Sequence, residues 1–111
     1  MSIAVPVDEL GAALAERPWG YLLTVRDDGR AQTLALPTVW RDGALVGEVG
    51  RSTAANVLAR PTVTWVFPGA TGEEFSLIVD GDASVVGSTD GSTVVVRPTW
   101  AVLHRPALRP D

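Results

Sequence analysis

The sequence predicts a mainly β fold, in which six antiparallel strands and two short helices close into one small barrel. Two observations carry this prediction: runs rich in aromatic and β-branched residues recur along the chain, and Asp-Gly pairs separate several of them. The chain has 111 residues, which is the size of one domain. We therefore expect a single domain over residues 1–111, with its core over about residues 8–106.

The elements follow in order along the chain. We expect a short helix within "VDELGAALAERP" (residues 7–18), with Asp8 as its N-cap and Pro18 ending it. A second helix is expected over about residues 53–59, and Pro61 ends it. The six strands are expected over the remaining runs: 19–25, 31–40, 44–49, 62–67, 74–87 and 93–106.

Turn signals indicate how the strands connect. "RDDGR" (26–30) and "RDG" (41–43) contain the Asp-Gly pair of tight hairpins, so their flanking strands should pair antiparallel. Pro37 cannot donate to a ladder, so it marks an edge, a bulge or a bend. Asp80-Gly81-Asp82 indicates a bulge inside a long strand. Six twisted strands around one core favour closure into a barrel, which removes exposed edges.

Composition excludes several classes of function. The net charge of −4 is unlike the basic footprint of a nucleic-acid binder. The chain has no cysteine and all nine cationic residues are arginine, which excludes thiolate chemistry and a lysine Schiff base. His104 is the only histidine, so we expect no metal site. No apolar run approaches the ~18 residues of a membrane span, and the N-terminus lacks a signal-peptide pattern, so we expect a cytoplasmic protein without a membrane or nucleic-acid partner.

The stretch "GEVGRSTAANVLARP" (residues 47–61) leaves a strand, turns at Gly50 and starts a helix. A helix N-terminus offers unpaired N–H groups and a partial positive charge. Arg51 can bind a phosphate through two parallel hydrogen bonds, and Ser52 and Thr53 add hydroxyl groups. Two interpretations stay open. The stretch is an anion pocket for a phosphorylated cofactor, or it is a helix capped by Ser52 or Thr53 with Arg51 in solvent.

Four short motifs occur in order over about residues 8–87: L-x-T-V-x-x-D-G-R, W-R-D-G-x-L, N-V-L-x-R-P-x-V and V-D-G-x-A. In this order they resemble the pyridoxamine 5′-phosphate oxidase-like family, the FMN-binding split barrels. The resemblance implies a six-stranded antiparallel split β-barrel that forms a homodimer. It also implies FMN or a deazaflavin coenzyme in a groove between the two subunits.

The resemblance further implies which residues would hold the coenzyme. Its phosphate would lie near the loop after the third strand, against Gly50, Arg51, Ser52, Thr53 and Asn56. Its ring would lie against the second strand, around Leu36, Pro37, Thr38 and Val39. The chain departs from the family pattern S-R-K-x-x-N-L at one important place, because Thr53 stands where the lysine would be.

Four more residues are candidates for lining the groove. His104 and Arg105 could meet an acidic or carbonyl group of a substrate, or could instead cap a barrel end or pack across an interface. Trp65 and Trp100 are two of four tryptophans in or next to predicted strands. One tryptophan could stack on a planar ligand, although large aromatics also suit a barrel wall or a dimer contact. No catalytic residue is identified, because a flavin supplies its own redox chemistry.

The sequence leaves three hypotheses for function. The leading one is a flavin- or deazaflavin-dependent oxidoreductase that acts on a small organic substrate at a dimer groove. The second is a non-catalytic split-barrel protein that has lost flavin binding and acts as a ligand-binding or accessory protein, which the missing lysine favours. The third is heme binding, with His104 as the only histidine ligand. A homodimer is also expected because a small, sheet-rich chain gains from burying one more apolar face.

Overall fold

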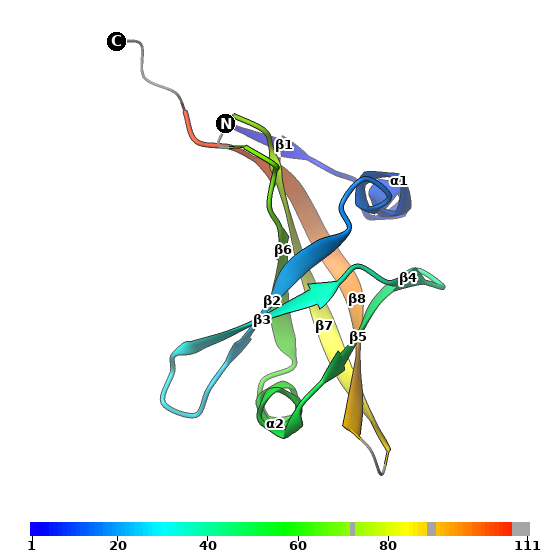
Figure 1. Cartoon of the computed structure of the whole chain (residues 1–111), viewed down its shortest axis with the longest axis vertical. Helices are drawn as coiled ribbons and strands as arrows, with labels where there is room; N and C mark the ends of the chain where they lie inside the picture. Colours follow the sequence, from blue (N-terminus) through cyan, green and yellow to red (C-terminus); the bar gives the residue numbers. More distant parts are fainter. Residues whose placement is uncertain (72, 89–90, 108–111) are drawn as a thin grey trace.

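The predicted fold class is confirmed by the computed structural model, which describes residues 1–71, 73–88 and 91–107. In these residues one antiparallel sheet has the strand order β3-β2-β6-β7-β8-β5-β4, and β1 pairs with β8 outside this path. Its strands are β1 (Ser2–Ala4), β2 (Trp19–Val25), β3 (Ala31–Pro37), β4 (Trp40–Arg41), β5 (Ala44–Val49), β6 (Thr62–Phe67), β7 (Ser76–Ser88) and β8 (Gly91–His104). The sheet curls into a half-barrel, with helix α1 (Leu10–Leu14) beside one end and helix α2 (Arg51–Ala59) at the other (Figure 1).

The described chain has two more strands than the six that the sequence predicts. Pro37 ends β3, and Trp40–Arg41 forms the separate strand β4, because proline cannot continue the ladder. Strand β1 has three residues and pairs with the last residues of β8, from Ser2 opposite His104 to Ala4 opposite Val102. So short a strand leaves no periodic pattern in the sequence, since its formation depends on a partner a hundred residues away.

The turn signals are confirmed. Gly29 has a φ of 84°, and Asp42 and Gly43 have φ values of 53° and 76°, as tight hairpins require. The register of β7 against β8 shifts between Asp80 and Gly81, where the sequence predicts a bulge. The predicted turn between these two strands falls partly on residues 89–90, which lie outside the described residues.

The first helix differs from the prediction. A 3-10 turn, η1 (Val7–Glu9), precedes α1, so Asp8 lies inside the turn and is not the N-cap of the helix. Glu9 takes the cap position without a side-chain hydrogen bond. The helix is therefore only five residues long, and its burial of Leu10 and Leu14 fixes its place against the sheet. No helix in the described part of the chain is long and apolar enough to cross a membrane.

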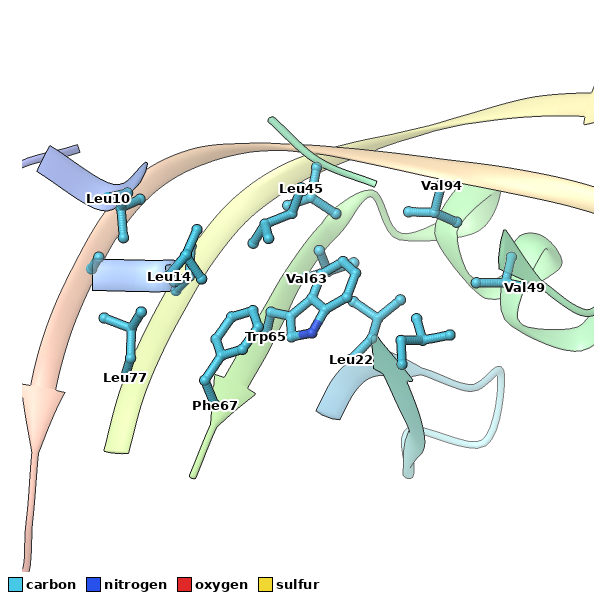
Figure 2. Packing of buried hydrophobic residues seen from close by; sticks show 14 of the residues in the cluster. Leu10, Leu14, Leu22, Leu45, Val49, Val63, Trp65, Phe67, Leu77 and Val94 are labelled. Atoms are coloured by element: carbon cyan, nitrogen blue, oxygen red, sulfur yellow. The ribbon is translucent and has the colours of Figure 1, made fainter. Parts of the chain in front are cut away.

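The concave side of the sheet holds the core. Leu22, Trp65, Val79 and Ala101 lie side by side on four neighbouring strands and are almost without exposed surface. The rings of Trp65 and Phe67 stack with their centroids 5.9 Å apart, and Leu22 packs against the indole (Figure 2). Both helices add buried residues to this side, including Leu14 of α1 and Val57 of α2.

The opposite side of the same strands carries a second set of mostly apolar residues, here called the outer face. Its members alternate with the core residues along each strand and pair across the strands in two main rows. The outer face consists of Trp19, Tyr21, Leu23, Thr33, Ala35, Pro37, Thr64, Val66, Ile78, Asp80, Trp100 and Val102. Trp19, Tyr21 and Trp100 are among the exposed large hydrophobic residues of the chain.

Candidate functional site

The first turn of α2 is open. Gly50 takes the N-cap position with extended backbone, and the first helical hydrogen bond runs from the N–H of Ala54 to the Gly50 carbonyl at 3.1 Å. The helix thus begins two residues before the predicted start, so neither Ser52 nor Thr53 is the N-cap, contrary to one interpretation of the sequence. Gly50 has no side chain that could cap the helix. The place where a Cβ would lie is open space. A ligand can therefore reach the N–H groups of the first turn without meeting a side chain at position 50.

The predicted phosphate-binding side chains separate into exposed and buried ones. Arg51 and Ser52 are exposed, and no hydrogen bond or ion pair holds the Arg51 side chain within the described residues. Thr53 is only 3% exposed, so its side chain turns toward the interior. An anion at this end of α2 would meet the Arg51 guanidinium, the Ser52 hydroxyl and backbone N–H groups.

Asn56 belongs to a buried hydrogen-bond network that ties α2 to the sheet. Its Nδ2 donates to Thr24 Oγ1 at 3.1 Å and to Gln32 Oε1 at 2.7 Å, and the residue is 8% exposed. Gln32 Nε2 in turn donates to Ser52 Oγ at 3.1 Å. The amide of Asn56 therefore positions the helix, and Gln32 carries the network to the exposed hydroxyl of Ser52.

A cavity of about 360 Å³ lies between the end of β3 and strand β5. Leu36, Pro37 and Val39, three of the four predicted ring-binding residues, line it. The fourth, Thr38, lines a different cavity, of about 320 Å³, and its backbone N–H donates to the Pro18 carbonyl at 3.0 Å. The structure thus brings three of the four together and places Thr38 apart from them.

The far side of this cavity is polar at its rim. Glu48 lines it and accepts a hydrogen bond from Thr93 Oγ1 at 3.0 Å, and Arg41 lines it as an exposed cation. Gly47 forms part of the wall, where a Cβ would come within 2.9 Å of Leu36 Cδ1. Glycine at this position therefore lets β3 and β5 approach closely.

Strand β3 connects the cavity with the α2 terminus. Gln32 near one end of the strand contacts Ser52, and Leu36 and Pro37 at the other end line the cavity. With a rise of ~3.3 Å per residue, Gln32 and Leu36 are about 13 Å apart along the strand. This stretch suits an elongated ligand with an anionic group at one end and a flat apolar part at the other.

The predicted groove-lining residues are not gathered at this site within one chain. Trp65 is 0% exposed and stacks on Phe67, so it is a core residue and cannot line an open groove of this chain. His104 Nδ1 lies 3.1 Å from Ser2 Oγ, at the end of β8 that pairs with β1. Arg105 lies over the Phe75 ring at 4.8 Å. This end of β8 is remote from α2 (Figure 1).

Sequence reasoning missed Thr24, Gln32, Arg41, Glu48 and Thr93. The signal for Gln32 was its position: it alternates with Leu34 and Leu36, so it is a polar residue on the buried face of β3. Arg41 and Glu48 carried no comparable signal, because exposed charges at strand ends are common. Only the curl of the sheet brings β3 and β5 together around the cavity.

Comparison with known proteins places the chain among similar folds. No family model matches it. The uncharacterised protein Mb0449c of Mycobacterium bovis is 38% identical over 116 residues, which cover 93% of this chain and 82% of that protein. An F420 reductase of known structure is 26% identical, with a TM-score of 0.67 over 80% of this chain and 93% of its own.

Three more distant structures share the fold. A candidate pyridoxamine 5′-phosphate oxidase from Listeria innocua has a TM-score of 0.73 at 14% identity, over 87% of this chain and 96% of its own. A FAD-binding protein from Mesorhizobium loti has a TM-score of 0.70 at 15% identity, over 93% and 96%. The heme storage protein HutZ from Vibrio cholerae has a TM-score of 0.68 at 17% identity, over 86% and 91%.

The curled antiparallel sheet with a helix after its fifth strand defines the chain as a split β-barrel protein. Its structural neighbours include flavin-, F420- and heme-binding proteins of this fold. The chain belongs to the same family as Mb0449c, and its fold is the pyridoxamine 5′-phosphate oxidase-like split barrel.

Proposed function

We propose that the protein is a flavin- or deazaflavin-dependent oxidoreductase that acts on a small organic substrate as a homodimer. The observation that carries this proposal is the open first turn of α2, where the Arg51 side chain has no partner within the described residues, joined along β3 to the cavity at Leu36 and Pro37. The similarity to an F420 reductase at 26% identity supports the same class of cofactor.

The phosphate end of the coenzyme would bind at α2. Gly50 leaves the approach clear, and the N–H groups of the first turn point toward it. Arg51 would contribute two parallel hydrogen bonds, and the Ser52 hydroxyl is held in place by Gln32. Asn56 would act indirectly in this proposal, by holding α2 against Thr24 and Gln32.

The ring would bind in the 360 Å³ cavity. Leu36, Pro37 and Val39 would cover its apolar surface and exclude water, while Arg41 and Glu48 stand at the rim where a polar edge would lie. When bound, a flavin or deazaflavin ring supplies hydride or electron transfer. The chain's own residues bind and orient the ring, and the two rim charges set the electrostatic field around it.

A binding titration tests this proposal. We expect FMN or the deazaflavin coenzyme F420 to quench tryptophan fluorescence saturably at micromolar concentration. Arg51→Ala should weaken binding about tenfold or more, because a charge-assisted hydrogen bond contributes roughly 1.5–3 kcal/mol. Arg97→Ala is the matched control, since Arg97 is an exposed arginine on β8 opposite Asp82.

Riboflavin, which lacks the phosphate, separates the two halves of the site. If Arg51 binds phosphate, Arg51→Ala should leave riboflavin affinity unchanged while it lowers FMN affinity. If the dimer binds neither FMN nor F420, the proposal is wrong.

A second candidate function is a non-catalytic protein that binds another ligand in the same cavity. It is favoured by the single cation at the α2 terminus and by Thr53, which replaces the lysine of the family pattern and is 3% exposed. This candidate predicts no response to FMN or F420.

A third candidate function is heme binding, which the similarity in fold to HutZ supports. A shift of the hemin Soret band on mixing with the protein, absent in His104→Ala, would support it.

A further inference from the structure

We propose that the free edge of β1, with the groove beside it, binds an extended basic segment of another protein. The segment would add one strand to the sheet through backbone hydrogen bonds to Ser2 and Ala4, and would place apolar side chains in the groove. This inference goes beyond the proposed function and does not depend on the coenzyme. Within the described chain, the groove shares no lining residue with the 360 Å³ cavity.

Strand β1 pairs along only one of its two edges. Strand β7 pairs with β8 from Gly91 to His104, so β1 and β5 lie along the other edge of β8. Strand β4 pairs with the far edge of β5, whereas no strand in the described residues pairs with the far edge of β1. A strand added beside β1 would therefore continue the line of β4.

The register shows which backbone groups lie on this far edge. The N–H of Val5 donates to the Ala101 carbonyl at 3.0 Å, so Val5 faces β8. Residues of an antiparallel strand face its partner alternately. The N–H and carbonyl groups of Ser2 and Ala4 therefore point away from β8, and in the described structure no loop or helix bonds to them. Two residues with this orientation offer two donors and two acceptors to an added strand.

The edge also lacks the usual protection. Natural edge strands carry charged residues, proline or a bulge, which keep other strands from pairing with them. All three residues of β1 are exposed, none is charged, and Ile3 is 49% exposed. Met1 and Val7, on either side of the strand, are 62% and 38% exposed. An apolar and uncharged edge of this kind is typical of a strand that pairs with a partner.

A groove of about 1240 Å³ lies beside β1 on the concave side of the sheet. Ile3 and its cross-strand partner Leu103 line it, and Leu103 packs against the core. Trp40 of β4 and Gly11 of α1 line it as well, and a Cβ on Gly11 would come within 3.1 Å of Trp40 Nε1. Strand β1 and helix α1 lie at the same end of the molecule (Figure 1). Alternate side chains of an added strand would point into this apolar groove.

The charges at the groove favour a basic partner. Asp8 and Glu9 are the only charged residues among the described residues that line it. Both are exposed, and neither forms an ion pair in the part of the chain that the structure describes. A lysine or arginine of the partner would complement them. A second copy of this chain would bring the same carboxylates and a net charge of −4, so it suits the groove less well.

Selection from a displayed library of random peptides about ten residues long tests the inference. We expect the purified protein to enrich peptides that alternate apolar and polar residues and carry Lys or Arg near one end. The binding of an enriched, fluorescently labelled peptide is then measured by anisotropy. Ala4→Pro should weaken it about tenfold or more, because proline removes one outward N–H. Ala4→Ser keeps that N–H and is the matched control.

The acidic rim is tested with the same peptide. Glu9→Gln should weaken binding about threefold or more at low salt and reduce its dependence on salt concentration, because it removes an attractive charge. Glu16→Gln is the matched control, since Glu16 is an exposed glutamate outside the described lining of the groove.

N-methylation of the peptide reads the backbone pairing without altering the protein. An added strand turns every second N–H toward β1. Methyl groups on one alternate set of residues should therefore abolish binding, whereas methyl groups on the other set should leave it within about twofold.

Three results would overturn the inference. One is a library that yields no enriched peptide. Another is an enriched peptide for which both methylated sets bind equally, or which binds Ala4→Pro as tightly as wild type. The third is an assembly of the protein alone that Ala4→Pro disrupts and Ala4→Ser retains, because this would assign the edge of β1 to a second copy of the chain.

Discussion

The concave side of the sheet, here called the inner face, and the outer face carry similar side chains and differ in what covers them. Trp65 on the inner face is 0% exposed, whereas Trp100 on the outer face is 50% exposed. The inner face is covered because the sheet curls around it and both helices add residues such as Leu14 and Val57. Hydrophobicity alone does not select the core side. The curl of the sheet and the position of the helices do.

The polar residues of the two faces make the same point. On the inner face, Thr24 of β2 is buried and accepts a hydrogen bond from Asn56 of α2, which is also buried. On the outer face, Asp80 is half-buried and held by Thr64. A buried polar group without a partner would cost roughly 1–3 kcal/mol. Thr24, Asn56 and Asp80 therefore each have a hydrogen-bond partner, whereas the buried indole Nε1 of Trp65 on the inner face has none within the described residues.

Truncating one tryptophan on each face should give the largest contrast. Trp65→Ala removes a fully buried side chain stacked on Phe67 and should lower the free energy of unfolding by ~3–5 kcal/mol. Trp100→Ala should lower the intrinsic stability of the chain by less than ~1 kcal/mol. If two copies meet on the outer face, it should weaken the dimer and make the urea midpoint depend less steeply on protein concentration. Urea unfolding at 1 and 50 μM checks both. Equal losses for the two variants at both concentrations would contradict the comparison.

Two glycines compare a tightly packed strand position with an open one. In Gly20→Ala, the added Cβ would meet Phe67 Cδ1 at 2.6 Å and the Val66 carbonyl oxygen at 2.8 Å, so we expect a loss of ~1–3 kcal/mol. In Gly87→Ala, an exposed position of β7 with no atom within 4 Å of the new Cβ, we expect a change within about 1 kcal/mol. Thermal unfolding of the pair measures the contrast, which a destabilised Gly87→Ala would remove.

Local signals in the sequence were sufficient for most of the fold. Asp-Gly pairs located the hairpins at Gly29 and Gly43, and β-rich runs located β2, β5 and β6. They were insufficient where structure depends on distant partners. Strand β1 exists because it pairs with the distant strand β8. Helix α2 starts at Arg51, two residues earlier than predicted, and its N-cap is Gly50, which has no side chain to cap the helix.

The candidate site could be proposed from the sequence to the extent that its residues are contiguous. The "GRST" stretch and Leu36-Pro37 could be proposed from motifs, and Arg51 is exposed and free in the described structure, as an anion site would need. The burial of Trp65 and Thr53 could not be predicted, because a tryptophan or threonine suits either side of a strand or helix. Glu48 and Thr93 meet only through pairing of β5 with β8.

The buried amide network should give an intermediate effect. Asn56→Ala removes both hydrogen bonds of Nδ2 and leaves Thr24 Oγ1 and Gln32 Oε1 without that donor, so we expect a loss of ~1–3 kcal/mol. Ser52→Ala removes only the exposed end of the network and should cost less than ~1 kcal/mol. Urea unfolding distinguishes them. An Asn56→Ala protein as stable as wild type would show that solvent reaches these groups.

The smallest effect is expected at the centre of the outer face. Asp80→Asn keeps an oxygen that can accept from Thr64 and removes the negative charge, so the intrinsic stability of the chain should change by less than ~1 kcal/mol. If two copies meet on this face, each brings one carboxylate out of water, and neutralising both should tighten the dimer several-fold. Sedimentation equilibrium at 0.1–10 μM measures the change. A weaker dimer would mean instead that Asp80 pairs with a cation of the partner, which would keep the outer face as the interface and make its centre polar.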